Sequence, residues 1–307
     1  MEKYINKIKE SITTPVTNIE LISETSNKVF KVTLESGEIL YAKFYEGNSY
    51  HIDNELKVYD LVDNKYLKEI YFKSLDYKMA IFKELIGKTV DELNEEEIDK
   101  YGDKIIDSII EYFTSISKTK TEGYGSLNNE LKGNYNSFIE FLKTRQGETS
   151  KELKKYKELS IISKLIFEKF EDILTPDNSL VPIDTNMKNI MVLNTGEIKF
   201  IDPGEMISAP ILMGYGDFIA HSYKTKLYKK LISRLNLTET EEKLVRIYAI
   251  FSSLNILAFL NKLGVEHLEE VIPYGNSETF QNLIIDHLSH LDINEDTIKK
   301  TLTKESE

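Results

Sequence analysis

Cysteine is absent from the 307 residues, and long uncharged apolar runs are absent as well. Without cysteine the chain has no disulfide framework, no thiolate zinc site and no thiol nucleophile. A membrane span needs roughly 18 consecutive apolar residues, and the richest apolar stretch, Tyr248 to Leu260, is shorter and has helical periodicity. The N-terminal segment MEKYINKIKE is charged throughout and lacks the apolar core of a signal peptide. We therefore expect a cytoplasmic protein with no membrane partner.

Basic charge is also scarce. The chain has 39 Lys and Arg residues against 51 Asp and Glu residues, which gives a net charge of -12. No Lys/Arg-rich run is present, so nucleic acid is not an expected partner. Hydrophobic residues make up 41% and charged residues 29%, the balance of a globular protein. The length favours one large domain or two lobes.

The first 90 residues or so favour β-structure. Apolar residues in 29–34 and 39–45 flank the turn signal Ser36-Gly37, which predicts a hairpin. Two further apolar runs follow at 70–72 and 79–82, after a segment of helical character at 54–62. Gly87 follows the last run at a natural linker position.

The remainder of the chain is mostly helical in pattern. Apolar residues recur at spacings of three and four in 105–113 and in 153–174, which predicts two core-facing helices. Thr238 and Glu241 form a capping-box signature ahead of a third helix. The segment 121–135 is rich in Gly, Asn and Ser and predicts a long loop. The charged tail after Asp292 is expected to fray at its end.

One short β-region interrupts this helical part. An apolar run at 179–183 leads to Asp184, and the runs 190–193 and 198–201 flank the turn Asn194-Thr195-Gly196. This hairpin can bring Asp202 back beside Asn189. Polar groups at the ends of short, rigid strands suit a functional site.

Each of these polar residues also has a purely structural interpretation. Asp184 and Asn189 alone could form a turn and a cap, because Asp and Asn favour both. Lys43 alone could be a surface lysine of a strand, and Glu55 alone a solvated helix residue. The five histidines show no metal-ligand spacing, and we expect no transition-metal site.

Taken together, the pattern resembles a known family. The segment D-x-x-x-x-N at 184–189, a short hairpin, and I-D-x-G at 201–204 resemble the catalytic and metal loops of protein-kinase-like small-molecule kinases. The similarity is greatest to the aminoglycoside phosphotransferase and choline kinase superfamily. The resemblance implies an α+β, two-lobed protein-kinase-like fold. It would have a small antiparallel-sheet N-lobe at residues 1–86 and a larger, mainly helical C-lobe at residues 87–307.

The N-terminal part contains matching pieces in the same order. Lys43 in the strand Tyr-Ala-Lys-Phe resembles the phosphate-binding lysine of the family, and Glu55 resembles its helix partner. Further pieces resemble the nucleotide loop, the hinge and the stretch after the metal loop; these are Ser26-Asn27, residues 82–88 and residues 214–220.

The resemblance implies a role for each matching residue. Asp184 would accept the proton of a substrate hydroxyl, and Asn189 and Asp202 would hold Mg²⁺ at the phosphates. The nucleotide, ATP or GTP, would contact Lys43, Glu55, Ser26, Asn27, Lys83 and Leu85. Two residues are expected to have substrate-facing or structural roles, Glu205 on the substrate side and Asp217 as a buried acceptor that braces the catalytic loop.

Three departures from the family pattern leave an alternative open. Pro182-Ile183 stands where the family has His-Gly, Ser23-Glu24-Thr25-Ser26 replaces a glycine-rich turn, and the metal loop reads Asp-Pro-Gly. The first two departures motivate the alternative of a catalytically inactive pseudokinase that acts as a binding or regulatory module. A metal-carboxylate hydrolase would leave Lys43 and the hinge unexplained.

The leading hypothesis is an ATP- or GTP-dependent phosphotransferase that acts on a hydroxyl of an aminoglycoside-like or choline-like small molecule. Antibiotic resistance is one role that such an activity would serve. The net charge of -12 suits a cationic acceptor. The acceptor itself, the nucleotide preference and the choice between monomer and homodimer stay open.

Overall fold

The N-terminal part is built on an antiparallel sheet. The computed structural model describes residues 1–24, 27–46, 56, 58–60, 65–128, 130–203, 206–262 and 277–306. Helix α1 (Glu2–Ser11) precedes a five-stranded sheet of order β1-β2-β3-β5-β4. Its strands are β1 (Val16–Glu24), β2 (Asn27–Leu34), β3 (Ile39–Tyr45), β4 (Ile70–Ser74) and β5 (Met79–Lys83). The predicted hairpin is confirmed as β2–β3, with Gly37 at φ +85° in its turn.

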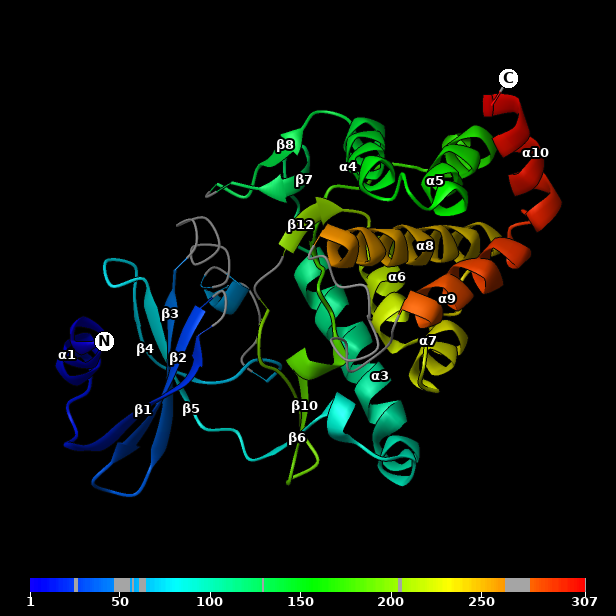
Figure 1. Cartoon of the computed structure of the whole chain (residues 1–307). Coiled ribbons are helices and arrows are strands. Elements are labelled where there is room, and N and C mark those ends of the chain that lie inside the picture. Colours follow the sequence, from blue (N-terminus) through cyan, green and yellow to red (C-terminus); the bar gives the residue numbers. More distant parts are fainter. Residues whose placement is uncertain are drawn as a thin grey trace.

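Strand alternation gives this sheet two different faces, because successive side chains point to opposite sides. One face carries an apolar cluster that includes Phe30, Leu40 and Ile81, and it is covered by α1 with Ile8 and by Ile12, the residue that follows the helix (Figure 1). The registers of β2, β3 and β5 place a second set on the opposite face; its members are Val29, Tyr41, Lys43, Ala80 and Phe82.

A small sheet of order β11-β10-β6 follows the five-stranded one. It consists of β6 (Gly87–Thr89), β10 (Ile190–Leu193) and β11 (Ile198–Phe200), and the β10–β11 hairpin was predicted. Gly87 was expected at a linker position, but it is a strand residue opposite Leu193. A Cβ atom at Gly87 would lie 2.2 Å from the carbonyl oxygen of Val192, so glycine is required by this close approach.

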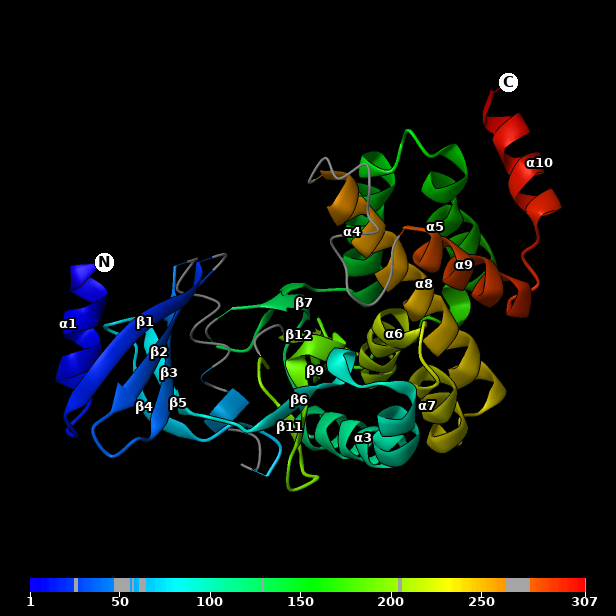
Figure 2. The ribbon, with the colours of Figure 1, turned by 60° about the horizontal axis from the view of Figure 1, so that its bottom comes forward.

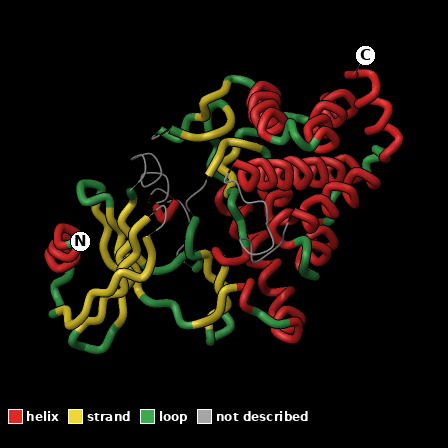
Figure 3. The backbone as a smooth tube through the Cα atoms, in the orientation of Figure 1, coloured by secondary structure: helices red, strands yellow, loops and turns green. Residues whose placement is uncertain are grey.

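Helices dominate the rest of the molecule, and in both views they lie to one side of the five-stranded sheet (Figures 2 and 3). They are α3 (Glu95–Ser117), α4 (Phe138–Glu152), α5 (Lys157–Phe170), α6 (Ile211–Ser222), α7 (Leu227–Leu235), α8 (Glu239–Lys262), α9 (Ser277–His290) and α10 (Glu295–Ser306). Short 3₁₀ turns occur at η1 (Val90–Glu92), η2 (Glu171–Ile173) and η3 (Met187–Asn189).

Helix α8 is the central helix of this part, and it packs against α4, α6 and α9. Its predicted capping box is confirmed, because the Glu241 side chain accepts from the Thr238 backbone N–H at 2.9 Å. Among the described residues, α8 alone has the length and hydropathy of a membrane span. The most apolar window of α8 is 72% buried inside the protein, so packing in the core accounts for its composition.

Two predicted boundaries are wrong. The expected loop 121–135 contains strands β7 (Tyr124–Leu127) and β8 (Gly133–Tyr135), where glycines allow a backbone approach that a Cβ at Gly133 would prevent. The expected helix 153–174 begins only at Lys157, because a turn separates it from α4. The charged tail contains helix α10, and the expected fraying of its last residues stays a prediction.

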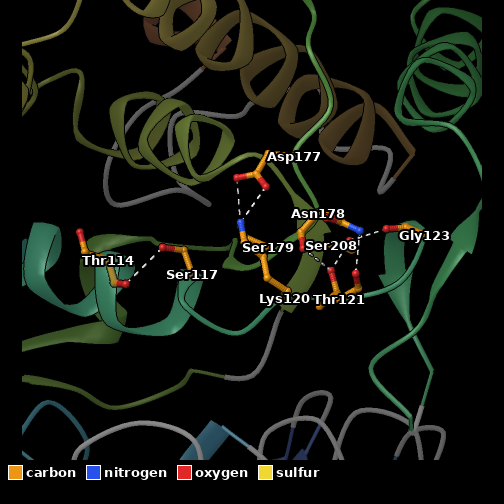
Figure 4. Close-up of polar contacts among 9 residues, drawn as sticks. All are labelled: Thr114, Ser117, Lys120, Thr121, Gly123, Asp177, Asn178, Ser179 and Ser208. Atoms are coloured by element: carbon orange, nitrogen blue, oxygen red, sulfur yellow. Dashed lines mark hydrogen bonds and ion pairs between the residues drawn. The ribbon is translucent and has the colours of Figure 1, made fainter.

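Strands β7 and β8 complete a third sheet, of order β8-β7-β12-β9, with β9 (Ser179–Pro182) and β12 (Met206–Ala209). Hydroxyl and amide groups tie its strands together (Figure 4). The buried Ser208 hydroxyl donates to the Gly123 carbonyl oxygen at 2.6 Å and lies 2.6 Å from Thr121 Oγ1. Asn178 Nδ2 donates to the Thr121 carbonyl oxygen at 2.7 Å. The end of β9 that is remote from Asp184 is thereby fixed.

Gly87→Ala tests the close approach of β6 and β10. The added methyl group would overlap the Val192 carbonyl oxygen, and we expect the free energy of unfolding in urea to fall by about 2 kcal/mol or more. Gly147→Ala is the matched control, because no atom of the described residues lies within 4 Å of a Cβ at this position in α4. The control should gain about 0.5–1 kcal/mol. Equal effects of the two substitutions would contradict the close approach.

His287 on α9 predicts a pH dependence of stability. Burial, followed by the nearby Arg246 guanidinium, lowers the pKa of His287 from 6.5 to about 3. Below pH 6.5, His287 therefore becomes protonated in the unfolded chain, whereas in the folded protein it stays neutral until the pH approaches 3. The contribution of His287 to stability is complete above pH 6.5 and is lost as the pH falls toward 3.

His287→Gln removes this titration. Between pH 6.5 and 5, the free energy of unfolding of the unmodified protein should fall more steeply than that of the variant, by at most about 1.4 kcal/mol per pH unit. Denaturant titrations at several pH values measure both slopes. Parallel slopes would show that His287 is accessible to protons in the folded state.

Candidate active site

Asp184 lies in a tight loop between β9 and η3. Its backbone is left-handed, with φ at 59°, and its side chain is exposed. Asn186 Nδ2 donates to Asp184 Oδ1 at 2.9 Å, and Asn189 Nδ2 donates to the Asp184 carbonyl oxygen at 3.1 Å. The two amides hold the carboxyl group and the backbone of Asp184 from within the same loop.

Asp202 follows β11, and the β10–β11 hairpin returns the chain to Asn189. The Ile201 N–H donates to the Asn189 carbonyl oxygen at 2.9 Å. Asp184, Asn189 and Asp202 share the wall of one small cavity. The three polar residues expected at strand ends are therefore neighbours in space.

Lys43 reaches this group from the five-stranded sheet. Its side chain is buried, with 7% of the residue exposed, and its Nζ lies 3.1 and 3.0 Å from Oδ1 and Oδ2 of Asp202. The pair joins residues 159 positions apart in the sequence. The lysine also lies 4.9 Å from the centroid of the Tyr45 ring. A cation and a carboxylate thus face each other where the sheet meets the segment that follows β11.

A cavity of about 450 Å³ opens beside this ion pair. Apolar side chains from both parts of the chain line it, namely Val29, Phe82, Met191 and Ile201. Polar residues line it as well, and they include Ser23, Asn27, Lys43, Asn189 and Asp202. A cavity lined by apolar side chains together with a cation and a carboxylate has the chemistry to hold a flat base and its attached phosphates.

The last residue of β5, Lys83, and Leu85 just beyond the strand also line the cavity. The N–H groups of Lys83 and Glu84 already donate to the carbonyl oxygens of Glu69 and Ile39. Tyr41 Oη donates to Glu84 Oε1 at 3.3 Å, and burial, followed by the Glu84 carboxylate, raises the pKa of this tyrosine. Tyr41 therefore keeps its proton and its hydrogen bond at neutral pH.

Asp217 on α6 is not among the residues that line the cavity. It is buried, with 9% exposed, and it accepts hydrogen bonds from the residue that follows Asp184. Thr185 donates its backbone N–H and its Oγ1 to Asp217 Oδ2 at 3.0 and 2.9 Å. The structure therefore connects Asp217 to the loop that carries Asp184, and the expected bracing role of Asp217 stays a prediction.

Three of the residues expected at the site, Ser26, Glu55 and Glu205, lie outside the described part of the chain. Three others were missed. Asn186 lies inside the D-x-x-x-x-N segment, where its position was a usable signal. Tyr41 and Lys68 line the cavity, and Lys68 Nζ lies 3.6 Å from the centroid of the Phe82 ring. No sequence pattern distinguishes Lys68 from other surface lysines.

The donor set fits a hard cation better than a transition metal. Among the described residues, no three His, Asp or Glu side chains gather into a metal-binding group. Asp202 and Asn189 offer one carboxylate and one amide oxygen, because Asn189 Nδ2 is already bonded to Asp184. Mg²⁺ commonly takes one or two such protein ligands and completes its shell with phosphate oxygens and water. The residues present therefore fit Mg²⁺ bound together with a nucleotide.

No protein-family profile matches the chain, and no curated protein matches its sequence. Solved structures do match. Aminoglycoside phosphotransferase APH(4)-Ia, in a ternary complex with AMP-PNP and hygromycin B, is 15% identical with a TM-score of 0.67, over 96% of this chain and 99% of its own. The choline kinase LicA from Streptococcus pneumoniae is 16% identical with a TM-score of 0.62, over 95% and 98%.

A putative fructosamine-3-kinase from Haemophilus somnus 129PT is 11% identical with a TM-score of 0.57, over 88% of this chain and 92% of its own. At such identities the similarity concerns the fold, and it extends over nearly the whole length of each chain. The α+β architecture expected from the sequence is thereby confirmed. The chain therefore shares the α+β, kinase-like fold of the aminoglycoside phosphotransferase and the choline kinase compared above.

Proposed function

We propose that the protein is an ATP- or GTP-dependent phosphotransferase that transfers the γ-phosphoryl group to a hydroxyl of a small molecule. The observation that carries the proposal is the ion pair of Lys43 with Asp202 at a cavity that Asn189 also lines, with Asp184 beside it. A hydrolytic dyad would explain neither the buried lysine nor the apolar lining of the cavity. Phosphoryl transfer uses all of these features, because it requires positioning and charge neutralisation.

The nucleotide base is assigned to the apolar part of the cavity. Val29 of β2 would contact one face of the base, and Met191 of β10 and Ile201 after β11 would contact the other. Because the N–H of Lys83 is already bonded to Glu69, this residue can offer the base only its carbonyl oxygen. Leu85 would complete the contacts along the same edge. Both adenine and guanine carry donors that suit a carbonyl acceptor, so the nucleotide preference stays open.

The triphosphate is assigned to Lys43, Asn189 and Asp202. Lys43 would bind phosphate oxygens as a point charge, which requires it to share or leave its contact with Asp202. Asn189 and Asp202 would bind Mg²⁺, which neutralises phosphate charge when it is present. The positive charges of Lys43 and Mg²⁺ would offset the repulsion between an anionic nucleotide and a protein of net charge -12.

Asp184 is assigned the role of proton acceptor for the substrate hydroxyl. Asn186 Nδ2 orients the carboxyl group through Oδ1, and the exposed carboxylate would accept the hydrogen bond of the hydroxyl. The hydroxyl oxygen would form the new bond to the γ-phosphorus, the bond from that phosphorus to the β–γ bridging oxygen would break, and the proton would pass to Asp184. The nucleoside diphosphate and the phosphorylated acceptor leave.

The acceptor is proposed to be an aminoglycoside-like or choline-like hydroxyl compound, and a role in antibiotic resistance is one consequence to test. The support is the net charge of -12, which favours a cationic acceptor, together with two structural neighbours, one a complex with hygromycin B and the other a choline kinase. We also propose residues 1–86 as the nucleotide-binding lobe and 87–307 as the lobe of the catalytic loop, in a cytoplasmic protein.

Asp184→Ala should abolish turnover, because the acceptor hydroxyl loses its proton acceptor. The assay is phosphoryl transfer from Mg²⁺-ATP and Mg²⁺-GTP to a panel of aminoglycosides, choline and amino sugars. We expect a loss of at least about 100-fold in kcat. Asp172→Ala, an exposed aspartate in η2, is the matched control and should keep full activity. Full activity of Asp184→Ala with an intact fold would sink the assignment.

Asp202→Asn should weaken Mg²⁺-dependent nucleotide binding, because the carboxylate would be replaced by a neutral amide of equal size. We expect affinity for ATP or GTP in millimolar Mg²⁺ to fall by about tenfold or more in calorimetric titrations. Binding without Mg²⁺ should change less. If the unmodified protein shows neither a thermal shift with millimolar Mg²⁺-nucleotide nor nucleotide hydrolysis, the pseudokinase alternative replaces this proposal.

A further inference from the structure

The backbone of Asp184 is in a conformation that needs support from its surroundings. Its φ of 59° lies in the left-handed region, which costs about 1–2 kcal/mol for a residue other than glycine. Such a conformation persists only where neighbouring contacts fix it. The contacts from Asn186 and Asn189 come from the same loop, so they cannot hold that loop against the rest of the protein. An external anchor is required.

The residue after Asp184 provides this anchor. Thr185 is bonded twice to Asp217 Oδ2, through its backbone N–H at 3.0 Å and its hydroxyl at 2.9 Å. Two donors from one residue to one oxygen fix both the peptide plane after Asp184 and the side chain of Thr185. The position of Asp184 therefore depends on the orientation of the Asp217 carboxyl group.

The orientation of Asp217 is in turn set by α8. Ser252 Oγ donates to Asp217 Oδ1 at 2.6 Å, across 35 residues of sequence. Oδ1 and Oδ2 are thus held by different elements, and the carboxyl group cannot rotate without breaking one set of bonds. His221 Nε2 lies farther away, 3.8 Å from Oδ2, and burial lowers the pKa of His221.

We propose that Ser252 is a positioning residue for Asp184, which acts through Asp217 and Thr185 and never contacts substrate. This inference rests on the proposed phosphotransferase function. It assigns to the central helix α8 a part in the catalytic geometry. It also identifies what braces the loop in a chain that has Pro182-Ile183 ahead of Asp184.

The test combines a kinetic and a structural measurement on Ser252→Ala in the full-length protein. We expect kcat for phosphoryl transfer from Mg²⁺-ATP or Mg²⁺-GTP, to the acceptor found in the panel or to water, to fall about tenfold or more. KM for the nucleotide should stay within about twofold, because the cavity residues are untouched. Amide hydrogen exchange at Thr185 should become about tenfold faster, since its acceptor is less fixed.

Two variants control for a general loss of structure. Ser252→Thr retains the hydroxyl and should restore kcat and the protection of Thr185. Ser253→Ala removes the next hydroxyl along α8, which is fully buried and has no hydrogen-bond partner among the residues that the structure describes, so neither readout should change. A purely structural effect of Ser252→Ala would lower the thermal midpoint without separating kcat from KM.

Unchanged exchange at Thr185 in Ser252→Ala would overturn the inference, and so would faster exchange with unchanged kcat. Thr185→Val gives a second route, because it removes the hydroxyl bond and leaves the backbone bond in place. Thr185→Val should also lower kcat. Thr185→Ser keeps the hydroxyl and should keep the kcat of the unmodified protein. If the unmodified protein transfers no phosphoryl group to any acceptor or to water, the proposed function fails, and that failure is distinct from the exchange result.

Discussion

The ion pair between Lys43 and Asp202 is the interaction on which the geometry of the site depends. A lysine side chain that is only 9% exposed would be strongly destabilising without a charged partner, and the two oxygens of Asp202 at 3.0 and 3.1 Å supply one. Because Asp202 is itself 43% exposed, the pair is still open to solvent and to ligands on one side. The contact fixes the five-stranded sheet relative to the loop after β11, and the cavity lies between them.

This pair exists because each partner is positioned by a strand. The registers of β2, β3 and β5 place Lys43 on the face opposite the cluster that α1 covers. A slip of one residue in β3 would turn Lys43 into that apolar cluster. The other partner, Asp202, lies beside Asn189 because the β10–β11 hairpin reverses the chain direction. The pairing of Gly87 with β10 connects this hairpin to β6, the strand that follows β5 in the sequence.

The sequence predicts the parts of this arrangement that depend on local pattern. The β2–β3 and β10–β11 hairpins were identified because alternation and turn residues act over a few positions. Strands β7 and β8 were missed because their glycines serve a close backbone approach, while their composition is typical of a loop. Asp184, Asn189 and Asp202 could be found from spacing. Ser252 and Lys68 could not, since their contacts join segments far apart in the sequence.

The anchoring of the catalytic loop bears on the choice between an enzyme and an inactive module. Asp217 is a buried carboxylate with three donors, and apolar side chains of similar volume often replace such buried charged groups without loss of stability. The left-handed backbone of Asp184 is a further local cost. A module that only binds a ligand at the cavity needs neither feature. A phosphotransferase needs both, because its proton acceptor must be held to within a fraction of an ångström, and the combination favours catalysis.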